Sequence, residues 1–409
     1  MEKKPIVIVG AGLAGLTCAL TCHEADFPVL LLEKSDEVGG RVRTDQVDGF
    51  LLDRGFQVYL DAYPTTGSFL DLEALDLRAF EPGAFVFDGH KFHTVMDVFR
   101  RPKALLKSVL SPVGTILDKL RVAVLRQKVL DLSLEEIAKR PDRSTEAYLQ
   151  ECGFSKKMID VFFRSFYGGI FLERELQTSS RMFEFTFRMF SKGRATVPAK
   201  GMGEIPKQLA GRLPDGVLTL NADVVSVERD RVTLANGEVI EASAVVVATE
   251  ASAAAKLVSA FAVDSPSWRG VSNYYFAADS SPLDERMIAL NGSGKGLINN
   301  IAVMSDISPE YAPKGKALIS VSVIEEENFQ SQVIKELRDW FGEEVKSWEL
   351  LRVDQIPHAL PTQKKTMAEG VRDYDGVFLC GDYQVSASIE GAVISGETAA
   401  KACLDFASL

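Results

Sequence analysis

Residues 5–34, PIVIVGAGLAGLTCALTCHEADFPVLLLEK, predict a strand, a glycine turn, a helix and a second strand. The β-branched run Ile6–Val9 is typical of a strand that is buried on both faces of a parallel sheet. Gly10, Gly12 and Gly15 follow in the pattern G-x-G-x-x-G. The first glycine permits a tight turn, the second lets a pyrophosphate approach the backbone, and the third lets the helix pack on the strand. The stretch therefore predicts a dinucleotide-binding unit whose helix N-terminus faces the pyrophosphate.

The second strand ends at Glu33, about 20 residues after the first glycine. A carboxylate at this place can accept hydrogen bonds from both hydroxyls of an adenosine ribose, and it would repel a 2′-phosphate. A glycine pattern alone is weak evidence, but this one lies between the expected strand and helix and precedes the acid at the expected distance. The predicted contacts of this unit with a dinucleotide are Gly10, Ala11, Gly12, Ala14, Gly15, Glu33 and Lys34.

A second glycine element, EVGGRVRT (37–44), comes directly after the second strand. Gly39 and Gly40 allow close approach to the backbone, and Arg41 can neutralise a phosphate. The stretch GFLLDRGFQVYL (49–60) follows it. Because an NAD dehydrogenase would not be expected to carry the GGR element, these residues favour a flavin dinucleotide.

With VIVGAGLAGL, Glu33, GGR and DRGFQV, the chain resembles the FAD-binding amine oxidase superfamily, which includes monoamine oxidases, protoporphyrinogen oxidases and phytoene desaturases. In that superfamily, the segment similar to DRGFQV passes beside the flavin. The strand similar to ADVVSV (222–227) contacts adenine, and the one similar to AVVVATE (244–250) ends at the ADP moiety. The contacts implied by the resemblance are Gly55, Phe56, Gln57, Val58, Val224, Val225, Ala248 and Thr249.

The C-terminal stretch VFLCGDYQVSASIEGAV (377–393) indicates a buried strand, a polar turn and the start of a helix. The resemblance implies that this element closes the FAD site. Gly381 permits close approach, Asp382 accepts a hydrogen bond from the ribityl chain or lies near the pyrophosphate, and the helix N-terminus points at the flavin's pyrimidine edge. Because DYQVSASIEG lacks the cysteine that monoamine oxidases attach to flavin, we expect non-covalent FAD. The predicted helix contacts are Ser388, Ile389 and Ala392.

The fold predicted from these elements is α/β, with a Rossmann-like, discontinuous FAD-binding domain. A second, α+β substrate domain is expected to hold a mixed sheet and a helical subdomain. We predict the FAD-binding domain at 1–63, 195–262 and 372–409, and the substrate-binding domain at 64–194 and 263–371.

The composition bounds the class of protein. The chain has 409 residues and a net charge of −11, which argues against nucleic acid as a partner. Five cysteines without a CxxC pattern and four histidines predict neither a redox disulfide nor a metal site, and Cys18 and Cys22 are expected to pack in the core. The first residues run straight into a strand, so we expect no signal peptide and a cytoplasmic protein.

Two segments leave alternatives open. Residues 98–130 carry eight basic residues and one acid among Leu, Val and Ile. Such a basic amphipathic segment can lie in the interface of an anionic membrane, or it can be a solvated basic face over an apolar core contact. Residues 160–190 concentrate phenylalanine, which would line an apolar substrate tunnel or fill a core.

The catalytic residues are not identified by any motif. The weak candidates are Tyr383, His358 and Lys295, and there is no triad or HExxH pattern. We predict an oxidoreductase that transfers a hydride from a hydrophobic or amphipathic small molecule to flavin N5, with oxygen or a quinone as acceptor. The alternatives are a non-catalytic FAD-binding or assembly protein and an amine oxidase.

Overall fold

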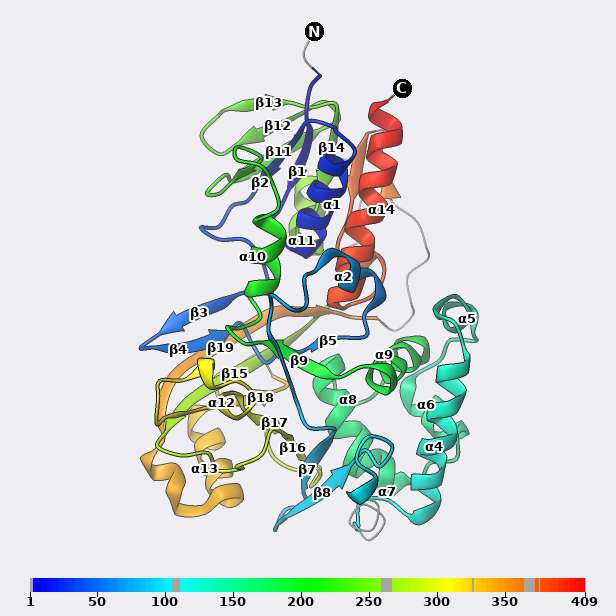
Figure 1. The fold of residues 1–409 in the computed structure, drawn as a ribbon, viewed down its shortest axis with the longest axis vertical. Helices are drawn as coiled ribbons and strands as arrows, with labels where there is room; N and C mark the ends of the chain where they lie inside the picture. Colours follow the sequence, from blue (N-terminus) through cyan, green and yellow to red (C-terminus); the bar gives the residue numbers. More distant parts are fainter. Residues whose placement is uncertain are drawn as a thin grey trace.

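The computed structural model describes residues 3–104, 111–258, 267–325, 327–363, 372–374 and 376–408. Residues 105–110 of the predicted amphipathic segment lie outside these ranges. Figure 1 shows two parts, one containing both the first strand and the last helix, the other a larger sheet beside a group of helices. Among the described residues, no helix is both long enough and apolar enough to cross a bilayer.

The first part is built on a six-stranded sheet with the order β10-β2-β1-β14-β21-β20. All neighbours are parallel except β20 and β21, as expected for a dinucleotide-binding unit. The β-branched residues of β1 and β14 are buried on both faces. The strands are β1 (Ile6–Val9), β2 (Val29–Leu32), β10 (Leu218–Thr219), β14 (Ala244–Val247), β20 (Arg372–Asp373) and β21 (Val377–Leu379).

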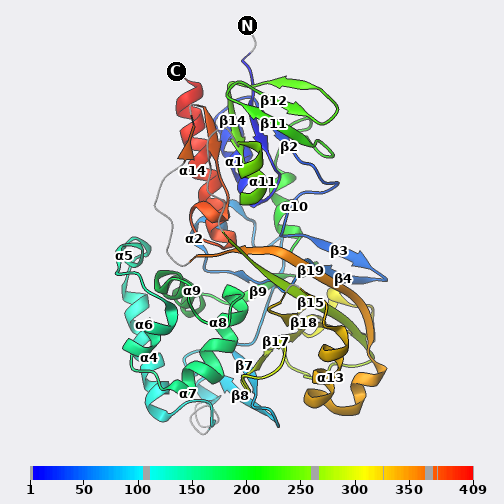
Figure 2. The ribbon, with the colours of Figure 1, turned by 180° about the vertical axis from the view of Figure 1, so that it is seen from behind.

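Alternate residues of these strands pack into two separate cores. Ile6 and Ile8 face helices α1 and α14, whereas Val7 and Val9 face helix α11 and a small antiparallel sheet on the other side. Figure 2 shows this second face from behind. The elements are α1 (Leu13–Glu24), α14 (Ile389–Ala407), α10 (Glu204–Ala210), α11 (Ala251–Leu257), β11 (Val224–Glu228), β12 (Arg231–Leu234) and β13 (Val239–Glu241).

The second part is built on a mixed seven-stranded sheet with the order β19-β15-β18-β17-β16-β7-β8. Only β7 and β16 pair in parallel, and α13 covers one face. Its elements are β7 (Gly83–Phe87), β8 (Phe92–Met96), β15 (Trp268–Ala278), β16 (Ile288–Asn291), β17 (Ile298–Val303), β18 (Ala317–Val323), β19 (Glu349–Pro361), α12 (Met304–Ile307), α13 (Gln330–Phe341), η4 (Pro309–Tyr311) and η5 (Gly342–Ser347).

A group of helices flanks this sheet and contains the phenylalanine-rich segment. Phe163, Phe171 and Phe183 are buried in its core, and Phe162 and Phe166 are partly buried against it. The described geometry therefore favours a packed core for much of 160–190. The helices are η1 (Pro102–Ala104), α4 (Ile116–Asp131), α5 (Leu134–Lys139), α6 (Thr145–Glu151), α7 (Lys156–Met158), η2 (Ile159–Phe163), α8 (Arg164–Phe171) and α9 (Ser180–Lys192).

Short elements join the two parts. The three-stranded sheet β5-β9-β6 contains β5 from before the predicted domain boundary at residue 63 and β6 from after it. The position of this boundary therefore stays a prediction. The turn η6 leads from β21 towards α14. These elements are β3 (Thr44–Val47), β4 (Phe50–Asp53), β5 (Tyr59–Leu60), β6 (Leu77–Ala79), β9 (Ala195–Pro198), α2 (Pro64–Phe69) and η6 (Asp382–Gln384).

Candidate functional site

The glycine loop between β1 and α1 has the geometry that the sequence predicts. Gly10 has φ +104°, and a Cβ on Gly15 would lie 1.9 Å from the Gly10 carbonyl oxygen. A Cβ on Gly12, by contrast, would meet nothing within 4 Å. Helix α1 starts there without a side-chain cap and without an acidic residue in its first turn. Open space thus lies at a positive helix end, which fits a pyrophosphate.

Glu33 lies at the end of β2 and is held against this loop. Its Oε2 accepts a hydrogen bond from the N–H of Ala11 at 2.7 Å, and its Oε1 accepts from the N–H and hydroxyl of Ser35 at 2.9 and 2.6 Å. The neighbouring Lys34 side chain is exposed and pairs with Asp223 at 3.3 Å. The role of Glu33 as a ribose acceptor stays a prediction, but its carboxylate is oriented by the loop itself.

The second glycine element lies beside the first. The N–H of Gly39 donates to the Ala11 carbonyl at 2.8 Å. Gly40 has φ +59°, and a Cβ placed on it would lie 3.8 Å from the Gly12 Cα. The two glycine elements therefore form one cradle that has little side-chain bulk, as a bound phosphate requires.

Arg41 joins this cradle to the C-terminal end of the chain. Its guanidinium donates to Asp382 Oδ1 at 2.6 Å and to the Ala359 carbonyl at 3.1 Å. Asp382 is 5 % exposed, whereas the Arg41 side chain is about a third exposed. Burial by itself would lower the pKa of Arg41, but the Asp382 carboxylate raises that pKa above its ordinary value. A permanent cation is thus held at the edge of the cradle.

The turn between β21 and α14 is tightly packed. The N–H of Gly381 donates to Ser395 Oγ at 3.0 Å, and a Cβ on Gly381 would lie 2.4 Å from the Tyr383 ring. Helix α14 begins at Ile389, and Ser388 caps it by accepting a hydrogen bond from the N–H of Gly391. Ile389 and Ala392 therefore lie in the first turn of the helix that follows Asp382.

Glu390 is a buried acid whose role the sequence does not reveal. Its carboxylate accepts hydrogen bonds from the N–H groups of Thr65 and Thr66 at 2.8 Å each and from the Thr66 hydroxyl at 2.6 Å. The first turn of α14 thereby holds the first turn of α2. The SIEG stretch by itself predicts an exposed glutamate at the start of a helix. Only the packing of α2 against α14 shows that Glu390 caps the first turn of α2.

The segment 53–58 crosses between the two parts of the protein. Gln57 Nε2 donates to the Arg41 carbonyl at 2.8 Å, and a Cβ on Gly55, which has φ +81°, would lie 3.0 Å from Ile356 of β19. Phe56 packs edge-on against Phe80, and Val58 packs on the core. The segment therefore lies between the GGR element and the larger sheet.

Asp53, at the start of this segment, is a second acid that sequence reasoning missed. It is 2 % exposed and accepts hydrogen bonds from Tyr311 Oη at 2.7 Å, from the N–H of Met202 at 2.9 Å and from the Thr44 hydroxyl. Burial raises the pKa of Asp53 to about 6, although these hydrogen bonds favour the ionised form. One carboxyl group therefore contacts three segments: the β3–β4 hairpin, the loop before α10, and η4 in the connection between β17 and β18 of the larger sheet.

The remaining predicted adenine-side residues lie near β1. The N–H of Ala248 donates to the Val9 carbonyl at 2.8 Å, which places Ala248 and Thr249 next to the glycine loop. Val224 is buried in the pairing of β11 with β12. Val225 lies at an irregularity of that pairing and is 54 % exposed.

Comparisons with known proteins agree with this geometry. A family model described as flavin containing amine oxidoreductase matches residues 13–404. The chain belongs to this flavin-containing amine oxidoreductase family. Its membership confirms the predicted superfamily and the predicted flavin cofactor.

Individual relatives match over shorter stretches. A phytoene desaturase from Fusarium fujikuroi is 31% identical over 111 residues, which are 25% of this chain and 20% of that protein. Protoporphyrinogen oxidase 2 from Arabidopsis thaliana is 27% identical over 41% of this chain and 33% of its own length. The chain thus matches only a fifth to a third of these curated relatives.

A solved structure matches over nearly the whole chain. An oxidoreductase from Methanosarcina mazei superposes with a TM-score of 0.77 at 18% identity, covering 98% of this chain and 100% of that one. At this identity the likeness establishes the fold, and it confirms the predicted α/β class.

Among the three weak catalytic candidates, His358 shares an aromatic neighbour with Arg41. The His358 ring stacks on Trp268 at 4.9 Å, and the Arg41 guanidinium lies 5.6 Å from the same Trp268 ring. His358 Nδ1 is 3.5 Å from Glu250 Oε2, at the carboxyl end of β14. The structure therefore brings His358 to the rim of the cradle, with its side chain 48% exposed.

The other two candidates are placed differently. Tyr383 is 4 % exposed and packs with β1 and β14 in the core that also holds α11, where burial raises its pKa far above the usual range. Lys295 is exposed in the turn between β16 and β17, and this turn contacts Glu336 of α13. Neither position by itself supports a role in proton transfer, and both assignments stay predictions.

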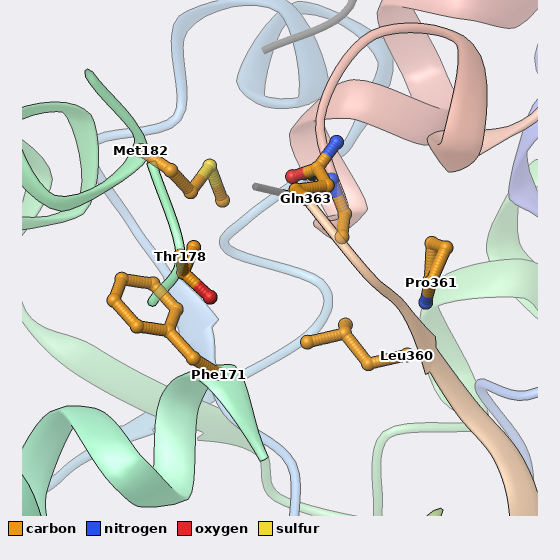
Figure 3. A pocket seen from close by; sticks show the side chains of 7 residues that line it. Phe171, Thr178, Met182, Leu360, Pro361 and Gln363 are labelled. Carbon is orange, nitrogen blue, oxygen red and sulfur yellow. Dashed lines mark hydrogen bonds between the residues drawn. The ribbon is translucent and has the colours of Figure 1, made fainter. Parts of the chain in front are cut away.

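A small cavity lies where the helices, the larger sheet and the α14 turn meet. Figure 3 shows Phe171, Thr178 and Met182 on one side and Leu360, Pro361 and Gln363 on the other. Its volume of about 10 Å³ holds at most one water molecule. The buried Nε2 atom of Gln363, which lines this cavity, has no hydrogen-bond partner within the described part of the chain. An unpaired donor at a cavity of this size fits one bound water molecule.

A group of thiols lies on the other side of α1. The Sγ atoms of Cys18, Cys22 and Cys403 lie within 4.8 Å of one another, and all three residues are fully buried between α1 and α14. The predicted core packing of Cys18 and Cys22 agrees with this burial. The sequence does not show that Cys403 joins them, because it is distant along the chain.

Proposed function

We propose that the chain is an FAD-dependent oxidoreductase that oxidises or desaturates a hydrophobic or amphipathic small molecule. The proposed reaction is hydride transfer to flavin N5, with oxygen or a quinone as acceptor. The observation that carries the proposal is the Arg41–Asp382 pair, at 2.6 Å, beside a cradle of two glycine elements. It joins the two ends of the chain in a protein of a flavin-containing family.

When bound, flavin supplies a ring that accepts a hydride. The protein's own groups bind and orient it. We assign pyrophosphate binding to the backbone N–H groups at the start of α1, ribose binding to Glu33, and charge neutralisation to Arg41. The proposed contacts are Gly10, Ala11, Gly12, Ala14, Gly15, Glu33, Lys34, Gly39, Gly40, Arg41, Gly55, Phe56, Gln57, Val58, Val224, Val225, Ala248, Thr249, Gly381, Asp382, Ser388, Ile389 and Ala392.

An apolar or amphipathic substrate is supported by the relatives that the chain resembles, which include a phytoene desaturase and a protoporphyrinogen oxidase. Phe171 of α8 and Met182 of α9 also line the small cavity beside the turn before α14. An amine substrate is the second candidate, because the matching family model describes amine oxidoreductases.

Anaerobic mixing of the purified holoprotein with substrates tests the proposal. The probes are a carotenoid-type polyene, a reduced tetrapyrrole and an aliphatic amine, and the readout is the flavin absorbance. We expect one probe class to bleach the oxidised flavin band, with recovery on adding oxygen or a quinone. Protein stripped of flavin is the control. If no class bleaches the flavin, the non-catalytic FAD-binding alternative replaces the enzyme, and we propose a cytoplasmic location in either case.

A further inference from the structure

Three cysteines from the two ends of the chain meet between helices α1 and α14. The Sγ atoms of Cys18, Cys22 and Cys403 all lie within 4.8 Å of one another, and we call these residues the three-cysteine cluster. Within the described part of the chain, it is the one group of at least three cysteine, histidine or carboxylate side chains with ligand atoms this close together. The sequence by itself predicts no metal site, because Cys403 lies 381 residues from Cys22.

The helix geometry holds the cluster together. Cys18 and Cys22 are one turn apart in α1, which puts their side chains on the same side of that helix. Cys403 faces them from α14, and Figure 1 shows the two helices side by side. The helices touch at Gly396, where a Cβ would lie 2.2 Å from the Ala14 carbonyl oxygen. A close backbone contact therefore fixes the distance across which the sulfur atoms face each other.

The spacing of the sulfur atoms fits one metal ion bound by all three. An ion at the centre of three sulfurs, with metal–sulfur bonds of about 2.3 Å, separates the sulfurs by about 4.0 Å. The Cys22–Cys403 distance of 3.8 Å and the limit of 4.8 Å for all three pairs bracket this value. A disulfide fits less well, since two sulfurs would have to approach to about 2.05 Å. The cluster can thus take an ion with little movement of the helices.

The ligand set indicates the kind of ion. Sulfur ligands favour soft ions such as Cu(I) over Mg²⁺, Ca²⁺ or Mn²⁺. Structural Zn²⁺ takes four ligands and iron–sulfur clusters are held by four cysteines, but no fourth cysteine, histidine or carboxylate of the described residues joins the cluster. We propose that the three-cysteine cluster binds one Cu(I) ion and so fastens α1 to α14. Each thiol that ligates the ion releases its proton to solvent, and no electron is transferred.

The proposed copper site is separate from the flavin cradle. Cys22 lies about 15 Å along α1 from Gly12, at 1.5 Å per residue. Both Cys22 and Cys403 lie in the last two turns of their helices, and residues 24–26 after α1 are exposed. Opening of these helix ends gives an ion a path to the buried sulfurs. Copper binding does not depend on the proposed reaction, so the two can fail separately.

Equilibrium dialysis of the flavin-loaded protein tests the copper site. The dialysis is anaerobic, contains ascorbate to keep the copper reduced, and sets the free Cu(I) concentration with bathocuproine disulfonate. Copper inside and outside the membrane is measured by atomic absorption. We expect the wild type to retain one Cu(I) per chain. Copper X-ray absorption should show three sulfur neighbours at about 2.3 Å.

Cys403→Ala and Cys22→Ala should each lower the Cu(I) affinity about tenfold or more, because each leaves only two sulfurs. Cys152→Ala is the matched control, since Cys152 lies at the end of α6 in the helical part, and it should bind like the wild type. Flavin content and circular dichroism check that each variant is folded. No copper in the wild type, or equal affinity of the wild type and both cluster variants, would overturn the proposal. Retention of Zn²⁺ without retention of Cu(I) would also overturn it.

Discussion

At the scale of single residues, Asp53 is a buried acid whose protonation depends on the packing around it. Asp53 is surrounded by Thr44, Tyr311 and the N–H of Met202, and no cation contacts it directly among the described residues. Burial therefore outweighs the hydrogen bonds, and its pKa rises from 3.8 to about 6. Arg352 supplies only a weaker, more distant attraction.

Asp53→Asn should change how stability depends on pH. Because the folded-state pKa lies above the unfolded value, protonation stabilises the fold, and this stabilisation is lost as pH rises through about 6. Relative to the variant, the wild type should lose about 1–2 kcal/mol of unfolding free energy between about pH 5 and pH 7.5. Denaturant unfolding at several pH values measures this. Parallel pH profiles for the two proteins would contradict the prediction.

Glu33→Lys should weaken flavin binding about tenfold or more, because it removes the acceptor for the Ala11 N–H and places a cation at a positive helix end. The ratio of flavin to protein absorbance after gel filtration measures retention. Glu238→Lys, the same change in the exposed turn between β12 and β13, should retain flavin normally. Normal retention by Glu33→Lys would remove Glu33 from the proposed site.

At the scale of elements, the contact between α1 and α14 holds the two ends of the chain together. A Cβ on Gly396 would lie 2.2 Å from the Ala14 carbonyl oxygen, so the helices touch backbone to backbone at this point. Cys22 and Cys403 meet at the same interface with their sulfur atoms 3.8 Å apart. Because the glycine loop precedes α1 and the Asp382 turn precedes α14, this contact sets the distance between the two proposed halves of the flavin site.

Gly396→Ala should push these helices apart. Overpacking of a backbone contact should lower the unfolding free energy by about 1–3 kcal/mol and reduce flavin retention. Thermal unfolding and flavin content measure the two effects. In Gly67→Ala, the matched change in α2, the new Cβ meets only Tyr59 Oη at 4.0 Å, so stability should stay equal or rise slightly. Similar behaviour of both variants would show that close approach at Gly396 is unimportant.

At the scale of the whole molecule, one sheet is assembled from distant parts of the chain. Strands β1 and β2 come from its start, β10 and β14 from its middle, and β20 and β21 from its end. The segment from β3 to β9 and the larger sheet are inserted between them. Contacts between residues that are far apart in the sequence therefore hold this part of the molecule together. Examples are the ion pair of Arg41 with Asp382 and the hydrogen bond of Thr66 to Glu390.

The sequence by itself determined the local parts of this protein. The strand–glycine–helix order of residues 5–34 follows from side-chain burial and from backbone angles that glycine favours, and both are properties of neighbouring residues. The resemblance carried by GGR and DRGFQV likewise led to the correct family and to a flavin. A short motif is enough to predict a binding site when neighbouring residues along the backbone form that site.

Only the tertiary structure decided which distant residues meet. Glu390 caps α2, Asp53 joins three segments, and Cys403 joins Cys18 and Cys22. The apolar side chains of Ile116, Leu120 and Val124 on α4 stay exposed. These features depend on which surfaces remain exposed after packing. A hydrophobic pattern states that a helix face is apolar, but burial also depends on what the rest of the chain brings against that face.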